Sequence, residues 1–342
     1  MATQDGKKAI LAIDGGGIRG LVPALILREL EGRLRARRKS EPLHRYFDMM
    51  AGTSTGGIIA AGLTAPSKDD QTKPAMSAEN LVRLYHDEGE KIFAKDKFRG
   101  LREALTRFNV DALMQEKYDA RALEELLEGY LGKAVLSDAL TNLVITAYDI
   151  EARRAVFLVG GPELGQGPTD FFFKDAARAT SAAPTFFEPE RVSDIRTGRA
   201  HVLVDGGVFA NQPSICAYAE AKHLWPEESL EILSLGTGYQ TRRFAYEDAK
   251  DWGPINWISP GQGAPIISIL MHGQAHSANW QMKQLLGSRF TRMDAAMIEG
   301  LGNDDMDDAS PENLVELTAL AEQIIHGNSR NLDAWADKLV AA

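Results

Sequence analysis

The chain has 342 residues, 44% hydrophobic and 25% charged, as is ordinary for a globular protein. Its net charge of −10 argues against nucleic acid as the main partner, because binding phosphates requires a concentrated basic face. The single cysteine, Cys216, excludes an internal disulfide bond, and with neither an apolar leader nor a membrane-spanning stretch in view we expect a cytoplasmic protein.

The first sixty residues alternate between apolar runs and glycine-rich turns. Residues 8–13 predict a buried strand that ends at the glycine-rich segment 14–20, and an amphipathic helix follows from about Pro23. A second apolar run leads into residues 52–57 and then into another apolar helix. Strand, glycine loop and helix, twice over, are typical of a parallel sheet covered by helices. We therefore predict a three-layer α/β/α fold with a mostly parallel central sheet.

The rest of the chain continues this alternation. Further helices are expected at 77–87, 120–130, 175–183, 211–223 and 266–286, and strands at 142–149, 154–159, 201–205 and 230–235. The strands at 142–149 and 154–159 form a hairpin in this prediction, and residues 95–118 show no clear period. We expect a core over 8–240, the remainder of the same domain over 241–302 (an aromatic loop, a long helix and a strand), and an acidic linker with C-terminal helices over 303–342.

The turn at residues 52–56 carries a serine at its apex. Gly52 and Gly56 lack a Cβ, so the chain can turn sharply from strand to helix and expose the Ser54 hydroxyl on a strained corner. The following helix directs its N-terminal N–H groups toward the same point. The G-x-S-x-G pattern is weak alone, since such a turn can also serve only the backbone.

Three glycine-rich corners each follow a predicted strand, at 15–20, 52–57 and 205–207. The carboxyl ends of parallel strands share one edge of a sheet, where ligands bind, so we expect the corners to converge. Acyl transfer needs a nucleophile, a base and N–H donors for the oxyanion. Ser54 and Asp205 are the candidates for the first two. The candidates for the donors are Gly15, Gly16 and Gly17.

The segment 15–20 also matches G-x-G-x-x-G, the fingerprint of dinucleotide-binding folds. That fold requires an acid at the end of the second strand, whereas here the second strand ends in the serine turn. Arg37 and Arg38 could contact a 2′-phosphate, but they precede that strand. The chain contains no G-x-x-x-x-G-K-[ST], so a P-loop is excluded.

In combination, three motifs resemble those of the patatin-like phospholipase family: DGGGIRG at 14–20, GTSTG at 52–56 and DGG at 205–207. The segments ATSAAP at 179–184 and LSLGTG at 233–238 resemble its secondary motifs. The resemblance covers roughly residues 8–240. The third motif of the family is often Asp-Gly-Ala, and the Asp-Gly-Gly of this chain is a variant of it.

This resemblance implies a serine lipid acyl hydrolase of the phospholipase A type, without metal or cofactor. Ser54 and Asp205 would form a catalytic dyad that cleaves ester-linked fatty acids through an acyl-enzyme. The implied oxyanion and substrate loop is Gly15, Gly16, Gly17, Ile18, Arg19 and Gly20, with Gly52 and Gly56 in the elbow and Gly206 and Gly207 in the acid loop. The substrate, a phospholipid or other acyl lipid, implies transient peripheral contact with a membrane.

Two other functions stay open. One is an effector switched on by a nucleotide signal at a separate regulatory site, as in some bacterial patatin-like proteins. The other is a lipid-binding or acyl-transfer module without hydrolysis. A Ser-His-Asp triad is the alternative to the dyad, with His223, His272, His276 and His326 as the candidates that follow the acid in the sequence.

Several side chains have two interpretations from sequence alone. Arg19 could contact a substrate phosphate or pair with an acid. Residues 171–173 (FFF) could belong to the core or to an acyl-chain pocket, and His201 shares a strand face with Asp205. The loop at 252–257, with a tryptophan at each end, could seat at a membrane or cover the site. The basic run at 33–39 could close a helix or dock on anionic lipid.

Overall fold

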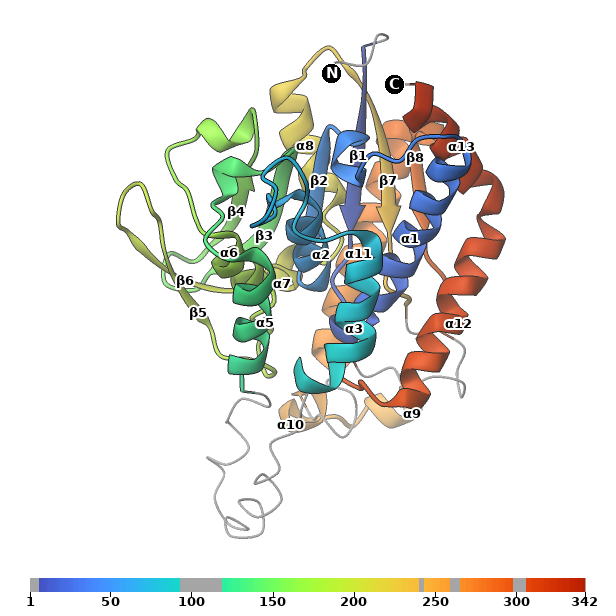
Figure 1. Ribbon diagram of the computed structural model, residues 1–342. Coiled ribbons are helices and arrows are strands. Elements are labelled where there is room, and N and C mark those ends of the chain that lie inside the picture. Colours follow the sequence, from blue (N-terminus) through green and yellow to red (C-terminus); the bar gives the residue numbers. More distant parts are fainter. Residues whose placement is uncertain (1–5, 93–118, 240–242, 259–264, 298–305, 342) are drawn as a thin grey trace.

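The computed structural model describes residues 6–92, 119–239, 243–258, 265–297 and 306–341 (Figure 1). The strands are β1 (Lys7–Ile13), β2 (Met49–Thr53), β3 (Asn142–Asp149), β4 (Arg154–Gly160), β5 (Glu190–Ser193), β6 (Ala200–Asp205), β7 (Ser229–Leu235) and β8 (Phe290–Met293). In the described part of the chain they form one sheet in the order β5-β6-β3-β2-β1-β7-β8, with β4 also paired to β3. The pairs β1–β2, β1–β7, β2–β3 and β7–β8 are parallel. The predicted fold class is confirmed.

The helices are α1 (Leu21–Ala36), α2 (Thr55–Thr64), α3 (Ala78–Ile92), α5 (Arg121–Leu131), α6 (Phe173–Thr180), α7 (Gly207–Ala210), α8 (Ser214–Leu224), α9 (Tyr246–Ala249), α10 (Pro254–Ile258), α11 (Pro265–Leu286), α12 (Pro311–Gly327) and α13 (Ser329–Ala341). A 3-10 turn, η1 (Gly17–Gly20), joins β1 to α1. The expected helix at 175–183 ends early, at Thr180, because Pro184 has no N–H to donate to the Thr180 carbonyl and its ring would clash with that carbonyl in a continued helix. The unassigned segment 95–118 lies outside the described residues. None of the helices in the described ranges, including the 22-residue α11, is long and apolar enough to cross a bilayer.

The central strands β2 and β3 are buried on both faces, and this explains their nearly unbroken apolar sequences. In β1, Leu11 and Ile13 belong to the core shared with α1, α2 and α3. Ile10 and Ala12 point the other way, into a second core with α8 and α11. The glycine-rich corners therefore follow strands whose last residues are buried, between two helical layers (Figure 1).

The C-terminal helices pack directly on α1. Leu317 of α12 and Trp335 of α13 are members of the main core. Arg33 and Arg37, two cations of the basic run, bind the carboxylate of Asp333 at 3.1 and 3.2 Å. These two cations therefore tie α1 to α13. We propose that the helices of the 303–342 segment belong to the same folding unit as the sheet and the helices that cover it.

Candidate active site

Ser54 occupies the tight corner between β2 and α2. It is one of a few residues other than glycine with a positive φ, at φ 55° and ψ −126°. A Cβ at Gly52 would lie 2.1 Å from the Gly56 carbonyl oxygen, and one at Gly56 would lie 2.2 Å from the Ile13 carbonyl oxygen. Only glycine fits at either position, so the predicted strand–turn–helix elbow is confirmed, with Ser54 at its apex and lining a pocket.

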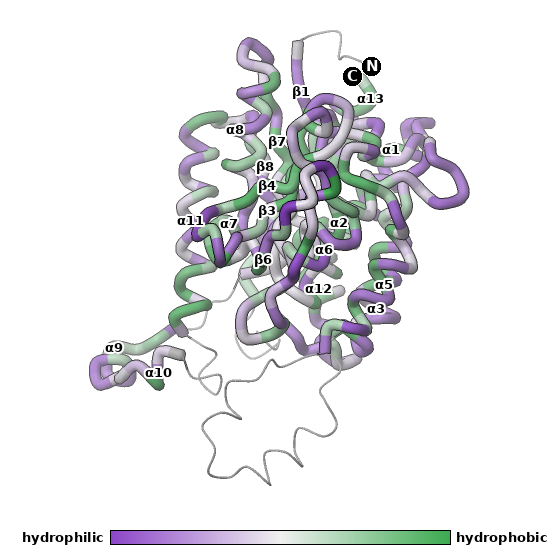
Figure 2. Tube along the Cα trace, turned by 90° about the vertical axis from the view of Figure 1, so that its left-hand side faces the viewer, coloured by the Kyte–Doolittle hydropathy of each residue, from purple (hydrophilic) through white to green (hydrophobic). Residues whose placement is uncertain are grey.

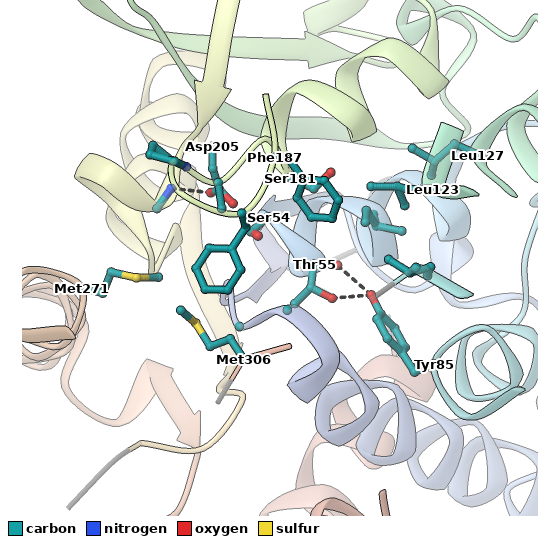
Figure 3. Close-up of a pocket in the computed structure, with 18 of the residues that line it drawn as sticks. Ser54, Thr55, Tyr85, Leu123, Leu127, Ser181, Phe187, Asp205, Met271 and Met306 are labelled. Carbon is teal, nitrogen blue, oxygen red and sulfur yellow. Dashed lines mark hydrogen bonds between the residues drawn. The ribbon is translucent and has the colours of Figure 1, made fainter. Parts of the chain in front are cut away.

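Asp205 ends β6 and is buried beside the same pocket. Burial raises the pKa of its carboxyl to about 7, although the Ser54 hydroxyl and the Gly207 N–H, which donates to Oδ1 at 2.7 Å, act against this shift. The turn that follows needs glycine, because a Cβ at Gly206 would lie 2.0 Å from Thr146 Oγ1. Figure 3 shows the side chains of Asp205 and Ser54 next to each other at the pocket.

The sequence argument for this meeting is wrong about the direction of β6, which runs antiparallel to β3. Thr146 and Ala147 of β3 both pair with β4 on one side, so β2 and β6 share the other side. There Thr53 lies opposite Thr146, and Asp205 lies opposite Ala147. The two strands thus meet end to end at adjacent residues of β3. This head-on meeting, rather than a shared parallel edge, brings Asp205 to Ser54.

Two amides of the glycine loop are already occupied. The Gly15 N–H donates to the Asn211 carbonyl at 3.0 Å, and the Ile18 N–H donates to the Met306 carbonyl at 2.9 Å. The expectation that Gly15 supplies an oxyanion donor is therefore wrong, because its N–H holds the loop to the segment after α7. The side chain of Ile18 is buried in the core and does not line the pocket.

Gly16 and Gly17 differ from their neighbours. Both line the pocket, and among the described residues their N–H groups have no acceptor. Gly17 has φ 60°, and a Cβ there would lie 2.0 Å from the Met306 carbonyl oxygen. A Cβ at Gly16 would lie 2.4 Å from Thr237 Oγ1. These two glycines thus line the pocket, have N–H groups without an acceptor among the described residues, and occupy positions where other residues do not fit.

Arg19 and Gly20 contact the parts of the structure around the loop and do not line the pocket. Arg19 is buried, its Nε donates to the Gly16 carbonyl at 3.3 Å, and it does not line the pocket. A Cβ at Gly20 would lie 2.2 Å from Thr55 Oγ1. The hydrogen bonds of Arg19 thus include one to the loop, and its charge acts on the neighbouring acid Asp14, in line with the second of its two interpretations.

The pocket beside Ser54 has a volume of about 190 Å³ and is lined mainly by apolar side chains. Leu123 and Leu127 of α5 form one flank with Tyr85 of α3, and Met271 of α11 lies on the other (Figure 3). Ser54 lies between these flanks (Figure 3).

The aromatic run at 171–173 does not form this pocket. Phe171 and Phe173 are buried in the main core, whereas Phe186 and Phe187 line the pocket. The interpretation of the run as core is confirmed for these two residues. The pocket phenylalanines could have been found from their position, two and three residues after the Pro184 that ends a motif.

None of the histidines is placed to act as a base for Ser54. The candidates for a triad were His223, His272, His276 and His326. None of the seven histidines, all of which lie in the described ranges, lines the pocket. Buried His201 bonds Asp149 at 3.0 Å, away from Asp205. His272 and His276 stack on each other, and no group of three or more His, Cys, Asp or Glu side chains in the described residues is arranged to hold a metal ion.

Sequence comparisons identify the family of the chain. Residues 11–214 match the family described as patatin-like phospholipase. The chain belongs to this family. It is 32% identical to patatin-like protein 2 of Oryza sativa subsp. indica, over 95% of this chain and 85% of the relative. It is also 32% identical to patatin-like protein 2 of Arabidopsis thaliana, over 92% of this chain and 82% of the relative.

Membership of the patatin-like phospholipases supports lipid acyl hydrolase activity in general, with lipids as substrates. One relative, 29% identical over 92% of this chain and 86% of its own length, is named a probable inactive patatin, patatin-3-Kuras 1 of Solanum tuberosum. The family alone therefore does not give the reaction of a particular member, which has to be argued from the residues of its site.

Proposed function

We propose that this chain is a phospholipase of the A type, which hydrolyses ester-linked fatty acids of membrane lipids with a Ser54–Asp205 dyad. The observation that carries the proposal is a buried carboxyl with a pKa near 7 beside a strained, pocket-facing serine. Such a carboxyl is about half ionised at pH 7 and is basic enough to accept a proton. The apolar pocket around Ser54 suits an acyl chain.

The proposed reaction has two steps. Asp205 accepts the hydroxyl proton as Ser54 Oγ attacks the ester carbonyl, and the alcohol then leaves with that proton, so that an acyl-Ser54 remains. Asp205 next takes a proton from water, whose oxygen attacks the acyl-enzyme. The fatty acid departs and the Ser54 hydroxyl is restored.

The charge on the carbonyl oxygen needs donors during both steps. The N–H groups of Gly16 and Gly17 are suited to this because both residues line the pocket and neither N–H has an acceptor among the described residues. Removing one such donor typically costs about 3 kcal/mol of transition-state stabilisation. The absence of pocket histidines among the described residues supports a dyad over a triad.

The proposal also places the mouth of the pocket at a lipid surface. Leu270 of α11 and Val208 both line the pocket and are exposed to solvent, and Ile255 of α10, which packs on α11, is 79% exposed. Figure 2 shows hydrophobic residues along the part of α11 nearest α10. The rings of Trp252 and Trp257 pack edge to face at 5.1 Å. Ile255, which lies between them in the sequence, is therefore more exposed than either tryptophan.

The hydrolysis is tested by fatty acid release from mixed liposomes together with fluorophosphonate labelling, with Ser54→Ala as the control. Labelling without fatty acid release would favour acyl transfer or lipid binding. Each assay is run with and without cyclic nucleotides, because a protein that is idle alone and active with nucleotide would favour the regulated effector.

The lipid surface is tested with Ile255→Asp and Trp257→Ala on phosphatidylcholine vesicles and on a soluble ester. Burial of an isoleucine side chain is worth roughly 1.5–3 kcal/mol, so vesicle activity of Ile255→Asp should fall about tenfold or more. The matched control is Val315→Asp, at a 69% exposed valine of α12, a helix that contributes no residue to the pocket. Equal losses on vesicles and soluble ester would reject the docking role.

A further inference from the structure

The turn after α6 touches the serine corner through one side chain. Thr180, the last residue of α6, is fully buried, and its Oγ1 accepts the N–H of Ser54 at 2.9 Å. The same oxygen donates to the Thr146 carbonyl at 2.7 Å. Thr180 therefore links the elbow to β3, the strand against which β2 and β6 meet.

The N–H of Ser54 needs this acceptor. Ser54 has a positive φ, a conformation that persists only where the surroundings hold it. A buried N–H without an acceptor is strongly disfavoured, so the hydroxyl of Thr180 stabilises the strained corner. Thr180 does not line the pocket, and it acts on the corner from behind.

The same turn also holds the acid. Two residues beyond Thr180, the Ala182 carbonyl accepts the N–H of Asp205 at 3.0 Å. One short segment thus binds the backbone of the nucleophile and the backbone of the base. Small residues allow this close approach, since Ala179 and Ala182 are fully buried.

We propose that Thr180 is a positioning residue for hydrolysis, and that the turn 180–182 sets the separation between Ser54 Oγ and the Asp205 carboxyl. The inference rests on the proposed dyad. Proton transfer from Ser54 to Asp205 requires the two groups within hydrogen-bond reach, so loss of the link lowers the rate of the chemical step. Substrate binding is unaffected because Thr180 has no contact with the pocket.

The first test compares Thr180→Val with Thr180→Ser on a soluble ester. Valine keeps the shape of threonine and removes the acceptor for the Ser54 N–H, so kcat should fall about 10- to 100-fold with KM unchanged. Serine keeps the hydroxyl and should recover kcat to within about threefold. A valine variant with near wild-type kcat, or a serine variant as impaired as valine, would overturn the role of the hydroxyl.

A matched control separates positioning from stability. Thr64 of α2 is also fully buried, and its hydroxyl donates to the Ala60 carbonyl at 2.7 Å within the helix. Thr64→Val should lower the melting temperature about as much as Thr180→Val and leave kcat unchanged. If both valine variants lose kcat in proportion to their stability, Thr180 is structural and the proposal fails.

A second route reaches Thr180 without removing its hydroxyl. A Cβ at Gly57 would lie 2.6 Å from Thr180 Cγ2, so Gly57→Ala displaces the threonine and should lower kcat. Thr180→Ser deletes that methyl, and the double variant should recover most of the lost rate. A double variant no better than Gly57→Ala would contradict the proposed coupling.

Hydrogen exchange of peptides covering residues 50–60 and 203–209 distinguishes this inference from the dyad itself. Thr180→Val should lose protection in both peptides, and Thr180→Ser in neither. If the variants show this pattern but the wild-type protein has no esterase activity, the positioning role of Thr180 stands and the dyad is rejected. If the wild-type protein is active but Thr180→Val leaves the protection of both peptides unchanged, the dyad stands and the positioning role of Thr180 is rejected.

Discussion

Asp205→Asn tests the proposed base through activity and stability together. Burial moves the pKa of Asp205 from 3.8 to about 7. At 1.36 kcal/mol per unit, ionising this carboxyl in the folded protein costs at most about 4 kcal/mol. Asparagine keeps an oxygen to accept the Gly207 N–H and carries no charge, so it should abolish hydrolysis and remove this cost.

The sign of the pH dependence follows from the raised pKa. The folded protein holds the proton of Asp205 more tightly than the unfolded chain does, so its stabilising effect is complete below pH 3.8 and is lost as the pH rises through about 7. Asp205→Asn should therefore gain stability relative to wild type between pH 5 and pH 8. The gain approaches its upper limit of about 4 kcal/mol only above pH 7.

Urea unfolding at pH 5 and pH 8 measures this gain, and kcat/KM on a soluble ester measures the ionised base. A group with a pKa of about 7 is roughly one-tenth ionised at pH 6 and nine-tenths at pH 8, so kcat/KM should rise about tenfold. Asp149→Asn, which changes the equally buried acid bound to His201, should keep the activity. A flat profile from pH 6 to pH 8, or an Asp205→Asn variant with a tenth of the wild-type activity, would refute the argument.

Two further predictions concern the glycine loop and the ion pair between Arg292 and Asp14, the residue before the loop. Gly17→Ala places a Cβ 2.0 Å from the Met306 carbonyl oxygen at φ 60°, and should lower kcat about 100-fold in the same ester assay. The control Gly32→Ala, in α1 with open space around it, should keep kcat and stabilise the protein by roughly 0.5–1 kcal/mol in urea unfolding. Arg292→Met removes the partner that binds both oxygens of Asp14 at 2.8 and 2.6 Å, and should destabilise the protein by about 3–5 kcal/mol at pH 8. Burial raises the pKa of Asp14 to about 6 despite that partner, so the loss should be smaller at pH 5, and equal losses at both pH values would contradict this assignment.

Local patterns were enough to predict the parts of the candidate site. The apolar runs predicted β1 and β2 because a strand buried on both faces has no polar side. The glycines predicted the elbow because a Cβ at Gly52 or Gly56 would meet backbone a few residues away or on the neighbouring strand. Ser54 and Asp205 could be named for the same reason, since Ser54 directly follows β2 and Asp205 ends β6, each at a turn that requires glycine.

The relation between these parts was decided only by the tertiary structure. The direction of β6 depends on its pairing with β3, more than fifty residues earlier, and no local period records whether two strands run parallel or antiparallel. Whether an amide is free depends on partners far along the chain: Asn211 takes the N–H of Gly15, whereas the N–H groups of Gly16 and Gly17 have no acceptor among the described residues. Local sterics and burial act over a few residues and can be recognised in the sequence, whereas hydrogen-bond partners exist only once distant segments have met.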